Sequence, residues 1–101
     1  MSTERNLARS VAAHIFVSGI VQGVGFRYFT QDHASARGLV GTTRNLSDGR
    51  VEVEVEGEQG RIEDLIRDLR KGPAGSKVDA VDVSWGSPSS RFSDFSITPS
   101  P

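Results

Sequence analysis

The sequence of 101 residues predicts an α+β fold in which two helices cover one face of an antiparallel sheet. Three observations lead to this prediction. Valine and glutamate alternate strictly over residues 51–56, which is typical of a strand with one buried and one solvent face. Residues 58–72 carry apolar side chains at the spacing of an amphipathic helix. A glycine-rich loop joins another alternating strand to a second helical segment.

The elements in the first half of the chain are a strand at 11–19, a helix at 26–37 and a strand at 39–45. The first strand alternates apolar and polar side chains. The helix follows a loop with three glycines in seven residues, and Gly38 is placed to end it. The third segment is rich in β-branched residues, which favour strands.

A turn at residues 46–49, "LSDG", opens the second half. The elements that follow are the alternating strand at 50–57, the amphipathic helix at 58–72, a strand at 78–85 and, after a polar loop, a short strand around Phe95 and Ile97. In the 78–85 strand, Val81, Val83 and Trp85 share the face that we expect to be buried.

The order of elements is therefore β-α-β-β-α-β with a short extra C-terminal strand. Two βα units with right-handed crossovers form the ferredoxin-like sandwich. We expect the helices to cover the valine face of the sheet and water to cover the glutamate face. We assign residues 12–98 to the domain and the polar residues 1–11 to a flexible N-terminal tail.

Composition limits the class of protein. The chain has no cysteine, which excludes a disulfide framework and a thiolate metal site. No apolar run approaches the ~18 residues of a membrane span, and the first ten residues lack the apolar core of a signal peptide. We therefore expect a cytoplasmic protein with no membrane partner, and we take it to be a monomer.

Charge is unevenly distributed along the chain, although the net charge is only -1. Residues 19–45 contain three arginines and one aspartate, whereas residues 46–70 contain four arginines and eight acids. A small anion is attracted to the first segment, and a long nucleic acid is repelled by the second. An RNA-binding module on this fold stacks bases on aromatic side chains of its central strands. The glutamates of the 50–57 strand argue against that function, so we expect no nucleic-acid partner.

The loop in "GIVQGVGFRYF", residues 19–29, is the candidate functional segment. Its first charge is Arg27, at the start of a helix, where a cation is unfavourable by about 0.3–1 kcal/mol. Backbone N–H groups of such a loop form a nest that binds anions, and a guanidinium adds two parallel donors suited to phosphate. The loop lacks the endings of the Walker A and dinucleotide motifs. On the glycines alone, a plain strand-to-helix turn stays an open alternative.

Two motifs resemble the acylphosphatase family. The first is G-x-V-Q-G-V-x-F-R over residues 19–27, and the second is "GTTRN" at 41–45 followed by "DGRV" at 48–51. The resemblance covers roughly residues 12–98 and includes "SDF" at 93–95. Two motifs in order, with a matching number of elements, are more specific than either motif alone. The sequence departs from the family pattern at Thr42 and Thr43, which we expect to affect sheet packing more than the loop.

The resemblance implies metal-independent hydrolysis of acyl phosphates to carboxylate and phosphate, without a cofactor. It implies that Arg27 and the loop bind the phosphoryl group and that Asn45 orients the attacking water. The phosphate-binding loop residues that it implies are Gln22, Gly23, Val24, Gly25 and Phe26. The implied partners are a small acyl phosphate and inorganic phosphate, which is product and competitor. His14 and His33 have no acidic residues at a ligand spacing, so we expect no metal site.

The sequence is also compatible with interpretations that give these residues no catalytic role. Asn45 is also a common turn former, Arg27 is also consistent with a surface arginine that packs its stem, and Gln22 is also consistent with a residue that only hydrogen-bonds the loop. The alternative function is a non-catalytic module that binds phosphate on the same fold. A related alternative is a detached copy of the acylphosphatase-like domain of carbamoyl-transfer maturation proteins. Fold alone does not separate these functions.

Overall fold

The computed structural model describes residues 7–101. Its elements are β1 (Ser10–Ile20), α1 (Phe26–Ala36), β2 (Val40–Asn45), β3 (Val51–Glu58), α2 (Gln59–Lys71), β4 (Lys77–Gly86) and β5 (Phe95–Ile97). This order confirms the predicted fold class and its short extra C-terminal strand. Neither helix in the described residues has the length and apolar character needed to cross a bilayer.

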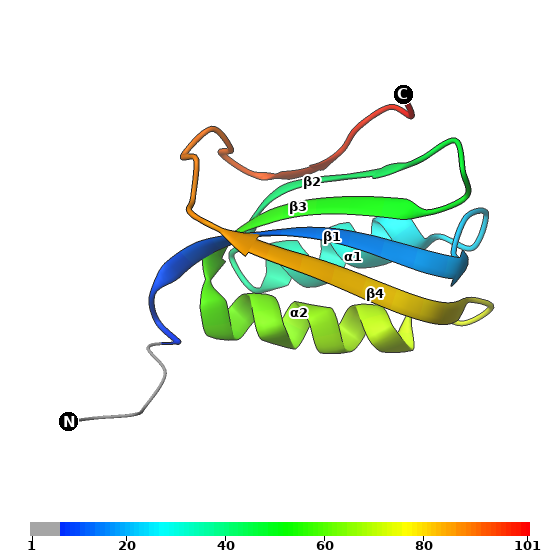
Figure 1. The fold of residues 1–101 in the computed structure, drawn as a ribbon, viewed down its shortest axis with the longest axis horizontal. Coiled ribbons are helices and arrows are strands. Elements are labelled where there is room, and N and C mark those ends of the chain that lie inside the picture. The colour runs from blue at the N-terminus through cyan, green and yellow to red at the C-terminus, as the bar shows by residue number, and fades with distance from the viewer. Residues whose placement is uncertain (1–6) are drawn as a thin grey trace.

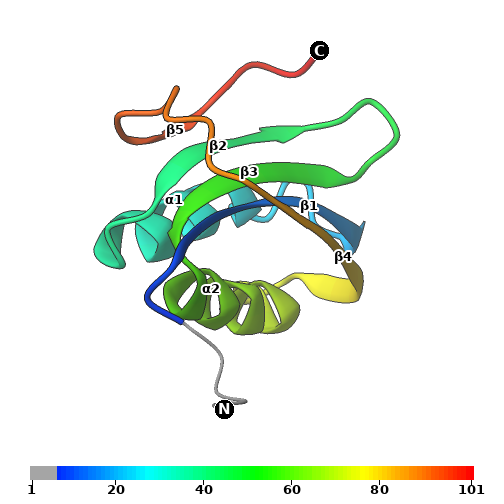
Figure 2. The same cartoon turned by 60° about the vertical axis from the view of Figure 1, so that its left-hand side comes forward.

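The sheet has the strand order β4-β1-β3-β2-β5 (Figure 1). Strands β1 to β4 pair antiparallel, as predicted, and β5 adds to β2 in parallel. The parallel direction was not specified by the sequence, and it follows from the long loop that carries the chain from β4 across to the far edge. Both helices lie on one face of the sheet (Figure 2).

The core fills the space between the sheet and the two helices. Alternate residues of β1 and β3 point into it, and Ile15, Val17 and Val53 are fully buried. Helix α2 buries the predicted apolar stripe, and α1 buries Phe26 and Thr30. The Thr30 hydroxyl donates to the Phe26 carbonyl at 2.9 Å, so this polar group is satisfied inside the core.

The segment before β1 is attached to the start of α2. The backbone N–H groups of Gln59 and Gly60 donate to the carbonyls of Arg9 and Leu7, at 3.0 and 2.9 Å. These bonds satisfy first-turn donors of a helix that has no side-chain cap. Strand β1 begins at Ser10, two residues before the expected domain boundary. The predicted flexible tail comprises residues 1–11. Of these, residues 1–6 lie outside the described residues.

A β-bulge in β4 lies opposite the end of β1, where Asp79 is the extra residue between Val78 and Ala80. The register with β4 shifts between Ser18 and Gly19. A Cβ atom at Gly19, where φ is 126°, would lie 2.1 Å from the Lys77 carbonyl oxygen. Glycine is therefore required for the close approach of β4 at this point. The chain then enters the glycine-rich loop at a defined position and direction.

The expectation that the whole glutamate face is wet was wrong at Glu56, which is only 6% exposed. The loop between β4 and β5 folds over it, and the carboxylate accepts bonds from the Ser89 N–H at 3.0 Å, the Ser89 hydroxyl at 2.6 Å and the Ser90 N–H at 3.3 Å. Burial opposes ionisation, but these donors outweigh it and hold the pKa of Glu56 below its usual value.

The expectation for Trp85 was also wrong, because this residue is 47% exposed. Trp85 is the last residue but one of β4, and β4 is an edge strand. A residue at the end of an edge strand has sheet neighbours on one side only, so alternation along the strand does not ensure burial. The two valines that precede it at alternate positions do pack against the core.

We expect Glu56→Gln to lower the free energy of unfolding by about 1–3 kcal/mol at pH 7, because a buried carboxylate loses charge-assisted hydrogen bonds. A carboxyl whose pKa is lowered by folding makes its full contribution to the free energy of unfolding when the pH is above its ordinary pKa of 4.5. That contribution is lost as the pH falls through the lower folded value. The difference between the two proteins should therefore shrink below pH 4.5 in urea titrations.

The matched control for this experiment is Glu54→Gln, on the same strand and face. Glu54 pairs with Arg91 at 2.7 Å, and both side chains are more than one-third exposed. This substitution should change stability by less than about 1 kcal/mol. Equal effects of the two substitutions at pH 7 would contradict the assignment of Glu56 as the buried anchor of the loop.

Candidate functional site

Three segments meet at one end of the sheet. Loop 21–25 follows β1 and leads into α1, and Asn45 is the last residue of β2. Val51, the first residue of β3, is paired with Val17 on one side and with Asn45 on the other. The glycine-rich loop and the β2–β3 hairpin therefore project from the same end, as Figure 1 shows.

Backbone donors without a partner among the described residues line the loop. Among residues 7–101, no group accepts a hydrogen bond from the backbone N–H groups of residues 22–26. Gly25 stands at the helix N-terminus with φ 76°, and Gly23 has the same φ. A Cβ at either residue would meet nothing within 4 Å, so glycine serves here for backbone conformation and not for space. Consecutive donors ahead of a helix N-terminus have the character of an anion nest.

Arg27 is the cation beside these donors. It is half-buried in the first turn of α1, which contains no acidic residue. Within residues 7–101 its guanidinium is in no ion pair. The other two arginines of the segment behave differently, because Arg37 pairs with Asp68 and Arg44 with Glu52. The net positive charge expected from the sequence is therefore concentrated at Arg27.

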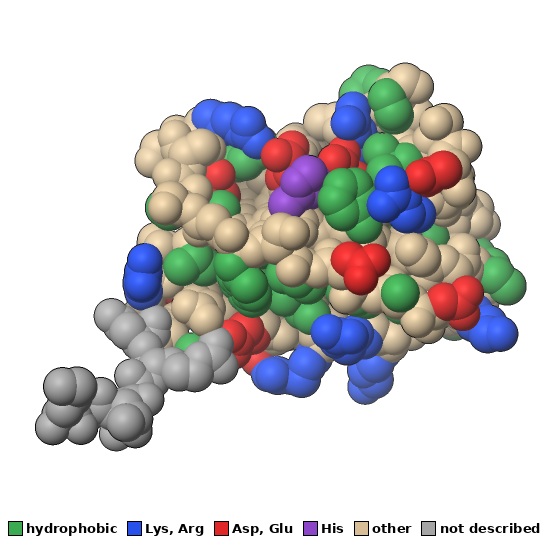
Figure 3. Space-filling view, viewed as in Figure 1, with side chains coloured by type: hydrophobic (Ala, Val, Ile, Leu, Met, Phe, Trp, Pro, Cys, Tyr) green, Lys and Arg blue, Asp and Glu red, His purple; other side chains and the backbone are tan. Residues whose placement is uncertain are grey.

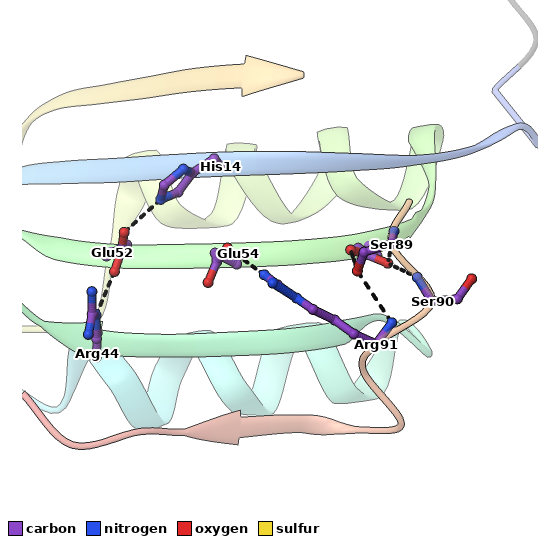
Figure 4. A network of polar contacts seen from close by, with 8 residues as sticks. His14, Arg44, Glu52, Glu54, Ser89, Ser90 and Arg91 are labelled. Carbon is purple, nitrogen blue, oxygen red and sulfur yellow. Dashed lines mark hydrogen bonds and ion pairs between the residues drawn. The ribbon is translucent and has the colours of Figure 1, made fainter. Parts of the chain in front are cut away.

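Arg44 precedes Asn45 but its side chain lies on the opposite face of the sheet. Its Nε donates to Glu52 Oε1 at 2.6 Å, and His14 Nε2 lies 2.6 Å from Glu52 Oε2 (Figure 4). Burial opposes ionisation of this carboxyl, yet Arg44 and His14 outweigh it and hold the pKa of Glu52 below its usual value. These side-chain contacts stabilise the last residue pairs between β2 and β3.

Asn45 lies on the helix side of the sheet, since its neighbours at alternate positions, Gly41 and Thr43, are buried. Its Oδ1 atom is buried and accepts no hydrogen bond from the described residues. A buried acceptor without a partner is uncommon in folded proteins and is a feature of sites that bind a ligand or water. A neutral carboxamide offers one acceptor and two donor hydrogens, which is enough to orient a water molecule.

Gln22 connects the loop to the hairpin. Its Nε2 donates to the Leu46 carbonyl at 2.8 Å and to the Arg50 carbonyl at 3.0 Å. Both donor hydrogens of the amide are therefore used, and the backbone N–H is the donor that Gln22 retains for an anion. The sequence marked Gln22 through its motif, but it gave no signal for the two carbonyl partners, because backbone acceptors have no residue preference.

Thr43, one of the two departures from the family pattern, is fully buried. Its hydroxyl donates to the Glu52 carbonyl at 3.0 Å, which satisfies its polar group within the β2–β3 pair. Thr42 points to the other face, opposite Glu54. Both departures are therefore accommodated in the sheet, away from loop 21–25.

A concave feature lies on the outer face of the sheet, away from loop 21–25. It is an open pocket of about 310 Å³ between the sheet and the β4–β5 loop, and its lining includes His14, Glu54, Trp85 and Arg91 but none of residues 22–27 and not Asn45. Figure 3 shows a histidine and acidic side chains beside a hollow on this side. In residues 7–101, no three His, Asp or Glu side chains are grouped so that they could hold a metal ion.

A family model, relatives and solved structures all include matches to one family. The family model described as "Acylphosphatase" matches residues 13–97. The acylphosphatase of Chlorobaculum tepidum is 59% identical over 70 residues, which are 69% of this chain and 76% of that protein. The crystal structure of acylphosphatase from Bacillus subtilis superposes with a TM-score of 0.85 at 38% identity, over 87% of this chain and 98% of the other.

A further match is to the crystal structure of full-length HypF in its phosphate- and nucleotide-bound form. Its TM-score is 0.84 at 38% identity, and it covers 91% of this chain but 12% of HypF. The same unit is therefore found both in small acylphosphatases and as one part of a much larger protein.

Proposed function

The chain belongs to the acylphosphatase family, and on that premise we propose that it hydrolyses the carboxyl–phosphate bond of small acyl phosphates. One observation carries the proposal: within residues 7–101 the N–H groups of residues 22–26 have no hydrogen-bond partner and Arg27 has no ion-pair partner, and both stand at the same end of the sheet as Asn45. The proposal covers small acyl phosphates as a class, because this arrangement recognises the phosphoryl part that all such substrates share.

In the proposed mechanism the loop binds the dianionic phosphoryl group. Backbone donors and the Arg27 guanidinium approach its oxygens, and they stabilise the charge that spreads over these oxygens in the transition state. The donors are fixed by the strand end and the helix start, so they need little reorganisation during the reaction. Phosphoryl transfer depends mainly on such positioning and charge stabilisation.

Asn45 orients the attacking water in this proposal. The water oxygen forms a bond to phosphorus while the bond between phosphorus and the carboxyl oxygen breaks, and the carboxylate leaves with the electron pair. One proton of the water passes to a phosphoryl oxygen of the substrate. Because the carboxylate is a good leaving group, the reaction needs no titratable base from the protein and no metal ion.

The same proposal includes a phosphate-binding loop at residues 22–27 and inorganic phosphate as product and competitor. We also propose that the protein is a cytoplasmic monomer without nucleic-acid or membrane partners. The glutamates of β3 support the exclusion of nucleic acid, because they pair with Arg44 and Arg91, which are therefore not free to bind a phosphate backbone.

We expect the purified protein to hydrolyse acetyl or benzoyl phosphate at an unchanged rate in the presence of EDTA, with competitive inhibition by inorganic phosphate. The physical reason is that the proposed site consists of backbone donors, one arginine and one amide. Release of carboxylate and phosphate is the measurement. Phosphate binding without turnover would support the non-catalytic alternative, and a loss of rate in EDTA that a divalent ion restores would contradict metal independence.

We expect Arg27→Ala to reduce kcat/KM by about 10²–10³, because it removes the charged donor from the transition state. Arg27→Lys should also be strongly impaired, since a point charge does not replace two parallel donors. Arg70→Ala is the control: Arg70 is an exposed arginine in the last turn of α2 and is likewise unpaired among the described residues. Turnover of the Arg27→Ala protein equal to that of this control would remove the assignment.

We expect Asn45→Ala to lower kcat by about 100-fold and to change KM by less than about threefold, because orientation of the water acts in the transition state. Thr42→Ala, on the same strand but the opposite face, should leave both constants unchanged. Steady-state kinetics on acetyl phosphate separates the two constants. A rise in KM at unchanged kcat would instead make Asn45 a binding residue.

A further inference from the structure

We propose that Gln22 is a positioning residue, whose side chain sets the placement of Asn45 relative to the phosphate-binding loop. The inference rests on the proposed function, because it concerns how the two halves of that site are held together. It assigns the Gln22 side chain a role in the alignment of water with phosphorus and none in the binding of phosphate.

The contacts of Gln22 support this role. Its Nε2 atom donates to the carbonyl of Leu46, the residue directly after Asn45, at 2.8 Å, and to the carbonyl of Arg50 at 3.0 Å. The Leu46 N–H itself donates to the Arg50 carbonyl at 2.8 Å. The side chain therefore holds the two residues that close the hairpin, which lie 24 and 28 positions away in the sequence.

The strand order explains why such a contact is needed. Strands β1 and β2 do not touch, because β3 lies between them. Loop 21–25 continues β1, and the hairpin continues β2 and turns back as β3. Within residues 7–101, the hydrogen bonds that join this loop to residues 45–50 all come from the Gln22 side chain. Without it, no hydrogen bond between described residues joins the loop to the hairpin.

The hydrogen bonds of the Gln22 amide distinguish a positioning role from a role in phosphate binding. Both hydrogens of the Gln22 amide point to hairpin carbonyls, so the side chain has no hydrogen left to donate to a phosphoryl oxygen. Loss of the side-chain amide should therefore leave the phosphate affinity nearly unchanged. It should lower the rate of the chemical step, since a displacement of about 1 Å in a reacting group costs about 100-fold.

The test compares Gln22→Met with Gln31→Met. Gln31 lies on α1 and its Nε2 donates to the Phe95 carbonyl at 3.2 Å, so this control also removes a bond from a glutamine amide to a backbone carbonyl. We expect Gln22→Met to lower kcat on acetyl phosphate by 10- to 100-fold. The inhibition constant of inorganic phosphate should change by less than about threefold. Gln31→Met should change neither quantity.

Coupling to Asn45 is the second measurement. If Gln22 acts through Asn45, then Gln22→Met in an Asn45→Ala background should lower kcat by less than about threefold. A full effect in that background, a parallel loss of phosphate affinity, or an unchanged kcat of Gln22→Met would each overturn the inference. Hydrogen exchange of the Leu46 and Gly49 amides reports on the hairpin independently of turnover, and it should accelerate in Gln22→Met but not in Gln31→Met.

Failure of the inference and failure of the proposed function give different results. A wild-type protein without turnover removes the proposed function, whereas an active wild type with an unimpaired Gln22→Met variant removes only the positioning role. If Gln22→Met does not fold at the assay temperature, Gln22→Asn replaces it. This variant keeps the amide but shortens its reach by one methylene, and the same reduction in kcat is expected.

Discussion

The pairing of Val51 with two strands is the constraint on which the arrangement of the site depends. Val51 faces Val17 of β1 on one side and Asn45 of β2 on the other. Because neighbouring strands are about 4.8 Å apart, this row fixes Asn45 about 10 Å from β1. A slip of one residue between β2 and β3 would turn Asn45 to the outer face. The buried valines of β3 and the Thr43 hydroxyl, which donates to the Glu52 carbonyl, oppose such a slip.

The elements and the segments of the site could be predicted from the sequence because local rules determine them. Alternation identified β3, helical spacing identified α2, and glycines at the end of a strand identified the loop before α1. Motif spacing then singled out Arg27 and Asn45, and chain topology brings the segments that contain them to one end of the sheet. The charge argument counted the arginines of the segment, but it did not show that Arg37 and Arg44 are paired while Arg27 is in no ion pair within residues 7–101.

The features that the sequence did not predict depend on contacts between distant residues. Glu56 follows the same alternation as Glu54, yet a loop more than 30 positions away folds over it and supplies three donors. Trp85 continues the apolar alternation of β4 but lies near the end of an edge strand, which has a neighbouring strand on one side only. The partners of Gln22 are backbone carbonyls, which every residue possesses. Periodicity describes the face on which a side chain lies, and it does not describe what covers that face.

The acidic row of β3 is compatible with the proposed binding of an anion at loop 21–25, because alternate side chains of a strand point to opposite faces of the sheet. Three glutamates project from β3 to the outer face, whereas Asn45 projects from the paired strand to the helix side. Glu52 is matched by Arg44 and His14, and Glu54 by Arg91, so each of these charges is compensated where it stands. A carboxylate on the helix side at this end of the sheet would repel a phosphoryl dianion in a partly desolvated site. The alternation that gives the sheet a dry and a wet face thus also keeps negative charge away from the proposed substrate.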